Sequence, residues 1–125
     1  MKILVADDAR TVRRLVSTRL TADGYDVVEA EDGEQALTLA RSEQPDAVVL
    51  DKVMPKIDGF EVVRQLRQQE ATRDVPIIML TERSGEDDVL DGLGLGVEEY
   101  MPKPFSPREL SARLQRILAK SAPSL

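Results

Sequence analysis

The sequence predicts an α/β fold built on a single doubly wound, five-stranded parallel sheet. Five short apolar runs indicate strands, and helical patterns separate them, so that strand and helix alternate along the chain. Such alternation is typical of a parallel sheet with helices on both faces, because right-handed crossover connections place the helices there. The expected strands cover residues 3–6, 26–30, 47–50, 77–80 and 98–101.

Helices are expected where apolar residues recur every three or four positions and so form one buried stripe. The first and last helices have the clearest stripes, and those of the second and third are weaker. The stripes are Val12, Leu15, Val16 and Leu20; Ala36, Leu37 and Ala40; Phe60, Val63 and Leu66; and Leu110, Leu114, Ile117 and Leu118.

Turn and cap residues support these helices. Gly24 stands where a C-terminal cap would end the first helix, and Ser106 to Glu109 form a capping box with Pro107 at the first helical position. The fourth helix, expected within 86–96, contains three glycines that each cost about 1 kcal/mol relative to alanine. We therefore expect it to be short or frayed.

The length and composition of the chain restrict the class of protein. With 125 residues we expect one domain over residues 1–120 and a disordered tail over 121–125. Lys and Arg number 17 and Asp and Glu 23, and the resulting net charge of -6 opposes direct binding to nucleic acid. The first apolar run is too short for a signal peptide or membrane insertion, so a cytoplasmic location is expected.

Polar residues stand where four of the expected strands end. Asp7 and Asp8 follow the first strand, Asp51 the third and Thr81 the fourth, and Lys103 comes just after the fifth. The carboxyl ends of parallel strands form the ligand-binding edge of such a sheet, so these residues are expected to converge. Each carboxylate pair about 4 Å apart costs on the order of 4 kcal/mol at an effective dielectric near 20. The cluster therefore predicts a divalent metal, and only oxygen ligands are available because the chain has neither His nor Cys.

Each of these residues also has an ordinary structural explanation. Asp7 and Asp8 can cap the first helix, and Asp51 can form a turn. Thr81 can cap the following helix, and Lys103 can be a solvated surface charge. Their shared position at the ends of strands favours a common site.

Four segments together resemble the receiver domain of bacterial two-component response regulators. They are ILVADD at 3–8, VVLDKVMPKIDGFE at 48–61, PIIMLT at 76–81 and EEYMPKPF at 98–105. The resemblance extends over residues 2–118. It implies a flavodoxin-like (βα)5 fold with strand order 2-1-3-4-5, an order known for a member of this family.

The resemblance also implies the chemistry of the site. Asp51 is the phosphoacceptor by this similarity, and Mg²⁺ or Mn²⁺ is held by Asp7, Asp8, Asp51 and the main-chain carbonyl of Val53. The donor is the phosphohistidine of a sensor histidine kinase or a histidine phosphotransfer protein. The domain would then be a switch rather than an enzyme, and would catalyse only its own phosphotransfer and dephosphorylation.

By the same similarity, phosphorylation is transmitted through three further residues. Thr81 and Lys103 bind the phosphoryl group, and Tyr100 moves inward. The face formed by the fourth helix, fifth strand and fifth helix then changes for an effector protein or a separate output domain. Arg13 and Arg14 of the first helix lie where the family docks its phosphodonor, although such charges are usually a solvated face.

Two residues depart from the usual pattern of the family. Glu82 follows Thr81 where the family usually has a small residue, and its carboxylate is expected to crowd the phosphoryl entrance and slow phosphorylation. Lys52, beside Asp51, either pairs with Glu82 across neighbouring strand ends or is a solvated loop lysine.

Three alternatives to the switch stay open at the level of sequence. A pseudo-receiver would bind a partner without phosphorylation, and Glu82 keeps this reading open. A phosphatase of the haloacid-dehalogenase type would have a second Asp where this chain has Val53. An FMN carrier of flavodoxin type would have a phosphate-binding loop in place of Asp7 and Asp8, whose carboxylates repel phosphate.

Overall fold

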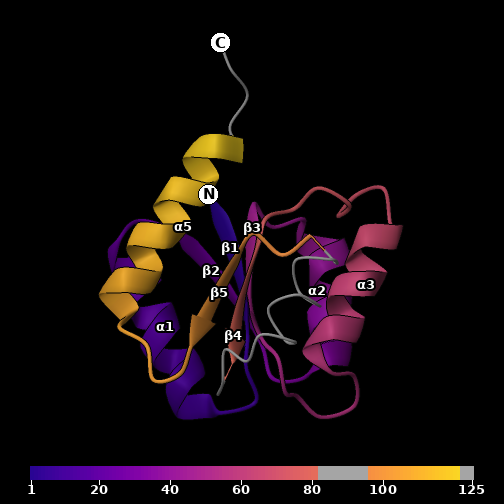
Figure 1. Ribbon diagram of the computed structural model, residues 1–125, viewed down its shortest axis with the longest axis horizontal. Helices are drawn as coiled ribbons and strands as arrows, with labels where there is room; N and C mark the ends of the chain where they lie inside the picture. Colours follow the sequence, from indigo (N-terminus) through magenta and orange to yellow (C-terminus); the bar gives the residue numbers. More distant parts are fainter. Residues whose placement is uncertain (82–95, 122–125) are drawn as a thin grey trace.

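The computed structural model describes residues 1–81 and 96–121 and contains the expected parallel sheet. All neighbouring strands are parallel, and their order is β2-β1-β3-β4-β5, as the resemblance implies. Figure 1 shows the sheet between two layers of helices. The strands are β1 (Lys2–Ala6), β2 (Asp26–Ala30), β3 (Ala47–Asp51), β4 (Ile77–Thr81) and β5 (Glu99–Pro102).

The strands begin or end within one residue of their expected positions. β3 and β4 each extend one residue further, so that Asp51 and Thr81 are themselves strand residues. The backbone explains this extension, since the N–H of Lys52 donates to the carbonyl of Leu80 and that of Lys103 to the carbonyl of Thr81. A polar side chain does not prevent backbone pairing, and the pairing fixes both site residues within the sheet.

Among residues 1–81 and 96–121, the helices divide into pairs on opposite faces of the sheet, as can be followed in Figure 1. The helices α1 (Arg10–Ala22) and α5 (Pro107–Ser121) pack on one face, and α2 (Gly33–Glu43) and α3 (Gly59–Gln68) on the other. Alternate residues of β1 enter the two cores: Ile3 and Val5 pack with α1 and α5, and Leu4 and Ala6 with α2 and α3. Burial on both faces explains why the strands are continuous apolar runs.

The apolar stripes predict most of the helix cores. The four expected residues of α5 are buried, as are those of α2. The assignment of Leu15 to the core of α1 is wrong, because its side chain is 53% exposed while Val16 and Leu20 are buried. Leu15 precedes Val16 by one residue, which places it about 100° around the helix from that buried position.

The expected caps are present at both ends of the fold. Gly24 has φ +97°, and Asp23 before it is the C-cap of α1. The backbone N–H of Glu109 donates to Ser106 Oγ at 3.3 Å, as in a capping box. The Glu109 carboxylate, however, pairs with Arg113.

Several expectations fall partly or wholly outside the described residues. The glycine-rich helix expected within 86–96 is one of them, and only Gly96, the last residue of that range, is described, with φ +81°. Of the tail expected over 121–125, Ser121 belongs to the last helix, and residues 122–125 lie outside the described ranges, as does Glu82. Within the part of the chain that is described, no helix has the length and apolar character needed to cross a membrane.

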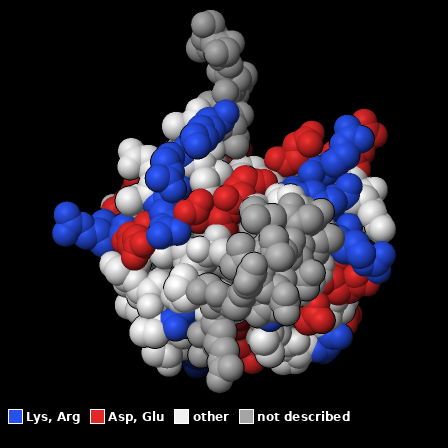
Figure 2. Space-filling view, in the orientation of Figure 1, with Lys and Arg blue, Asp and Glu red and all other residues white. Residues whose placement is uncertain are grey.

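Opposite charges stand next to one another on the molecular face in Figure 2, over both the α5 side and the α3 side. On α5, Arg113 contacts Glu99 at 2.6 Å and Glu109 at 2.8 Å. On α3, Arg64 pairs with Glu61. On this face, positive and negative charges therefore alternate on both sides, and neither side is uniformly basic.

Candidate functional site

The structure brings the polar residues of four strand ends together at one edge of the sheet. Asp7 directly follows β1, Asp51 ends β3, Thr81 ends β4 and Lys103 directly follows β5. The ladders that join β1 to β3, β3 to β4 and β4 to β5 place these ends side by side. The strand order therefore creates the site, because it makes neighbours of segments far apart in the sequence.

Three carboxylates form the centre of this site. Asp7, Asp8 and Asp51 each offer one oxygen, and these oxygens all lie within 4.8 Å of one another. Asp7 and Asp51 are buried, with exposures of 0% and 5%, whereas Asp8 is exposed. The cluster is thus open to solvent at Asp8 and enclosed at the other two residues.

Lys103 brings a positive charge to the two buried carboxylates. Its Nζ lies 3.1 Å from Asp7 Oδ2 and 3.4 Å from Asp51 Oδ2. Burial disfavours the charged ammonium, but the neighbouring carboxylates of Asp51 and Asp7 outweigh this effect and raise the pKa of Lys103. Lys103 is therefore a cation at neutral pH and offsets part of the acidic charge.

The surroundings of Asp51 work against its ionisation. Burial, reinforced by the negative charge of Asp7, raises the pKa of Asp51 to about 6. Lys103 and the backbone N–H of Val53, 3.4 Å from Asp51 Oδ1, act in the opposite direction. At neutral pH the Asp51 carboxylate is mostly ionised in spite of its burial, which a nucleophile requires.

Asp7 is held in place by both its backbone and its side chain. Its N–H donates to the carbonyl of Ala30, and its Oδ1 accepts the N–H of Ala9 at 2.9 Å. The N-cap of α1 is Ala9, with no side-chain cap. The alternative that Asp7 or Asp8 is the N-cap of this helix is therefore wrong.

Thr81 and Tyr100 extend the site toward β5. Thr81 is 3% exposed at the end of β4, beside the strand position that precedes Lys103. Tyr100 is partly buried and packs against the core formed with α2 and α3. The two residues occupy adjacent strands, as the switch expectation requires.

The loop after β3 forms one wall of the site. Val53 has an exposed side chain, so its backbone is what faces Asp51. Lys52 Nζ lies 5.4 Å from the ring centre of Phe60, within the range of a cation–π contact. The expected pairing of Lys52 with Glu82 involves a residue outside the described ranges.

Two neighbours of the site were not predicted from the sequence. A Cβ on Gly59 would lie 2.6 Å from the carbonyl oxygen of Asp51, so the start of α3 packs directly against the end of β3. Arg13 belongs to the first-helix charges, yet its side chain is only 12% exposed and donates to the carbonyl oxygen of Asp7. The Asp-Gly pair at 58–59 was available as a signal for the turn, but nothing in the spacing distinguished Arg13 from a solvated arginine.

The donor set fits a hard divalent cation. Carboxylate and carbonyl oxygens are the ligands that Mg²⁺ prefers, and the cation usually keeps several waters alongside one or two carboxylates. Asp8 lies on the exposed side of the cluster, where such waters can be accommodated. The buried pair of Asp7 and Asp51 supplies the negative charge that a cation would neutralise.

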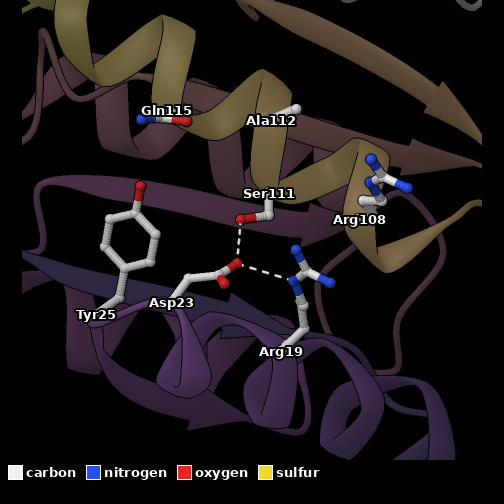
Figure 3. Close-up of a pocket in the computed structure, with 7 residues that line it drawn as sticks. All are labelled: Arg19, Asp23, Tyr25, Arg108, Ser111, Ala112 and Gln115. Carbon is white, nitrogen blue, oxygen red and sulfur yellow. Dashed lines mark hydrogen bonds and ion pairs between the residues drawn. The ribbon is translucent and has the colours of Figure 1, made fainter.

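A second hollow lies away from this site, between α1 and α5. Its volume is about 360 Å³. Figure 3 shows Arg19 and Ser111 directed at Asp23 from the two helices. The hydrogen bond from Ser111, and after it that from Arg19, lowers the pKa of Asp23. The polar groups at the centre of the hollow thus bind one another and connect α5 to the end of α1. The hollow is lined by Arg19, Asp23, Tyr25, Arg108, Ser111, Ala112 and Gln115.

Comparisons with known proteins identify the family of this chain. The response regulator receiver domain family matches residues 3–115. The chain is 51% identical over 120 residues to the alkaline phosphatase synthesis transcriptional regulatory protein PhoP of Bacillus subtilis, covering 96% of this chain and 49% of that protein. It is 50% identical over 119 residues to the probable transcriptional regulator ycf27 of Porphyridium aerugineum, covering 95% and 48%. The chain therefore spans about half the length of these curated relatives.

Solved structures give the same result. The chemotaxis protein CheY4 of Vibrio cholerae superimposes with a TM-score of 0.89 at 36% identity, covering 93% of this chain and 97% of that one. A doubly wound sheet with acidic residues at the ends of β1 and β3 is typical of signalling receiver domains. This chain belongs to the response regulator receiver domain family of two-component systems. Membership of this family leaves no support for the phosphatase and FMN-carrier alternatives.

Proposed function

We propose that this receiver domain is a phosphorylation switch whose phosphoacceptor is Asp51. The donor would be the phosphohistidine of a sensor histidine kinase or a histidine phosphotransfer protein. One observation carries the proposal: the Asp51 carboxylate is buried at a strand end, clustered with two other carboxylates and 3.4 Å from the ammonium of Lys103. A buried acceptor with a cation beside it suits a reaction that depends on positioning and electrostatics.

The transfer itself needs few groups. An Asp51 oxygen donates an electron pair to phosphorus, a P–O bond forms, and the P–N bond of the phosphohistidine breaks with its electron pair left on the imidazole nitrogen. No general base is required, because an ionised carboxylate has no proton to lose. This agrees with a chain that contains no histidine.

Mg²⁺, or Mn²⁺ in its place, would be held by Asp7, Asp8, Asp51 and the main-chain carbonyl of Val53. When bound, the cation supplies positive charge to the oxygens of the transferring phosphoryl group. Lys103 contributes a second point charge beside Asp51, and its ammonium also contacts Asp7.

Thr81 and Tyr100 would report the phosphorylated state. Phosphorylation adds roughly 1.5 to 2 negative charges and three acceptor oxygens, to one of which the Thr81 hydroxyl can donate. Movement of Thr81 would alter the packing of Tyr100 on the adjacent strand, and so the face that includes β5 and α5. The effector must bind the two states with different affinities for the signal to pass.

The output lies in an effector protein or in a separate output domain. The curated relatives are about twice the length of this chain and are named as transcriptional regulators. By that likeness we propose control of transcription as the output, exerted by a part other than this acidic domain.

Incubation with acetyl phosphate and analysis by intact mass spectrometry would test the proposal. We expect a mass increase of one phosphoryl group in the presence of Mg²⁺ and none in EDTA. Asp51→Asn should abolish the increase. Asp74→Asn, which removes the same charge from an exposed carboxylate outside the site, should leave it unchanged.

The outcomes separate the remaining readings. A chain that stays unmodified with both acetyl phosphate and a phosphorylated histidine kinase would contradict the switch and favour the pseudo-receiver. Modification that persists in Asp51→Asn would assign the acceptor to a different residue. Faster labelling of Glu82→Ala would show that Glu82 restricts the phosphoryl entrance.

A further inference from the structure

Arg13 connects the backbone of the acidic site to the neighbouring strand β2. Its Nη1 donates to the main-chain carbonyl of Asp7 at 2.9 Å, and its Nε donates to Glu29 Oε1 at 3.0 Å. The side chain is 12% exposed, so the guanidinium lies within the fold. A charge expected at the surface of α1 is therefore directed at the site.

The orientation of the Asp7 carbonyl is coupled to that of the Asp8 backbone. It belongs to the rigid peptide plane that joins Asp7 to Asp8, so a partner that fixes its oxygen also fixes the orientation of the next residue. The other polar atoms of Asp7 are held by Ala30, Ala9 and Lys103. Arg13 holds the remaining polar atom, the Asp7 carbonyl oxygen, which lies in the peptide that leads to the exposed residue Asp8.

The local sequence gives α1 little other means of holding this turn. Its N-cap, Ala9, provides no side-chain hydrogen bond, and its first turn contains no acidic residue. The guanidinium fork instead reaches back from the helix, with Glu29 fixing its plane from β2. A planar group with donors in fixed directions can bind both partners at once, which an ammonium cannot do with the same geometry.

We propose that Arg13 is a positioning residue that orients the Asp7–Asp8 segment for cation binding, through the Asp7 carbonyl and with Glu29 as its own support. The inference rests on the proposed function, because it assigns Arg13 a part in building the same Mg²⁺ site. It also separates Arg13 from Arg14. Arg14 approaches the same Glu29 at 3.9 Å but is 64% exposed.

The charge of Arg13 makes the test decisive. If the guanidinium acted on the site only through its positive charge, its removal would strengthen the binding of a cation. If it acts by orienting the carbonyl, its removal weakens binding. The two accounts therefore predict opposite signs for Arg13→Met, and Arg13→Lys keeps the charge while removing the fork.

The experiment titrates Mg²⁺ into the wild-type chain, Arg13→Lys and Arg13→Met. Binding is measured by calorimetry and by changes in amide NMR spectra. The matched control is Arg14→Met, which removes the same charge from the same helix without touching Asp7. We expect both Arg13 variants to bind Mg²⁺ roughly tenfold more weakly, the lower end for outer-shell partners of metal ligands, and Arg14→Met to bind within about twofold of wild type. In the metal-free protein, the Asp8 amide resonance should shift in the Arg13 variants only.

Wild-type affinity in Arg13→Lys, or tighter binding in Arg13→Met, would overturn the inference. If Arg13→Met does not fold, Arg13→Lys and Glu29→Gln decide, since each leaves most of the contacts of α1 intact. Absence of Mg²⁺ binding by the wild-type chain would instead contradict the proposed function. The Asp8 resonance in metal-free protein would then still show whether Arg13 orients that peptide.

Discussion

Asp51 combines two requirements that oppose each other. A nucleophile enclosed by the fold is shielded from water, but enclosure disfavours the charge that makes it reactive. Burial and the charge of Asp7 accordingly raise the pKa of Asp51 to about 6, while Lys103 limits the rise. The folded domain therefore bears an electrostatic strain at Asp51 that the unfolded chain, with an ordinary Asp pKa near 4, does not bear.

This strain predicts a pH dependence of stability in the metal-free protein. Between about pH 4 and pH 6 the folded state holds more protons than the unfolded state, so the free energy of unfolding falls as pH rises through this range. The contribution is present below the unfolded pKa and lost above the folded one. With about 1.4 kcal/mol for each pKa unit, the loss is on the order of 2 to 3 kcal/mol. Urea unfolding in EDTA at pH 4.5, 5.5 and 7 would measure it.

Asp51→Asn provides the control for this effect. An amide has no charge to lose, so the variant should be more stable than wild type at pH 7 and should lose most of that advantage near pH 4.5. An equal difference between the two proteins at all three pH values would contradict a raised pKa for Asp51.

At this scale the sequence revealed residues that carry charge at strand ends. Asp7, Asp51 and Lys103 each follow an apolar run, and the register of the sheet places these strand ends side by side. Arg13 could not be identified in this way, because a helical arginine is usually solvated. Only the tertiary contact with Asp7 distinguishes it from Arg14.

The beginning of α3 is in close contact with the end of β3. The N–H of Gly59 donates to the carbonyl of Lys52, and a Cβ on Gly59 would lie 2.8 Å from Lys52 Cα as well as 2.6 Å from Asp51 O. Backbone atoms cannot give way as a flexible side chain can. The start of α3 therefore sets the position of Asp51, the proposed phosphoacceptor.

Gly59→Ala should move these two elements apart. We expect a loss of about 1 to 3 kcal/mol in unfolding free energy, as for other overpacked sites, together with slower labelling by acetyl phosphate. Gly24→Ala is the matched control. It places a methyl group at φ +97° with no heavy atom within 4 Å, so it should destabilise the fold without changing the labelling rate. Labelling of Gly59→Ala at the wild-type rate would show that this packing does not position Asp51.

The alternation of strands and helices predicted a parallel sheet with helices on both faces, and the strand order followed from the resemblance to receiver domains. The ends of the strands were harder to predict, because Asp51 and Thr81 have the polar side chains typical of loops although their backbone belongs to the sheet. Leu15 shows the limit of the helical stripe. An apolar residue one position before a buried one satisfies the pattern, yet the face it occupies is decided by what packs against the helix.

For the whole molecule, the proposed binding of a cation at the acidic site would be linked to folding. The chain has a net charge of -6, and three of its carboxylates are gathered at one edge of the sheet. Without a cation this gathering opposes folding, and with one it favours folding. A ligand that binds only the folded state stabilises it by an amount that grows with concentration, about 2.7 kcal/mol at 100 times the Kd.

Asp8→Asn should therefore change the sign of its effect with Mg²⁺. In EDTA the variant should be as stable as wild type or slightly more so, because it removes one of three neighbouring charges at an exposed position. In saturating Mg²⁺ the wild-type chain should gain stability and the variant much less, since the cation has lost a ligand. Asp74→Asn removes the same charge elsewhere, so it should gain as much from Mg²⁺ as wild type does. Urea unfolding of the three proteins in both conditions would measure these differences, and an equal gain in Asp8→Asn and wild type would show that the acidic cluster is not where Mg²⁺ binds.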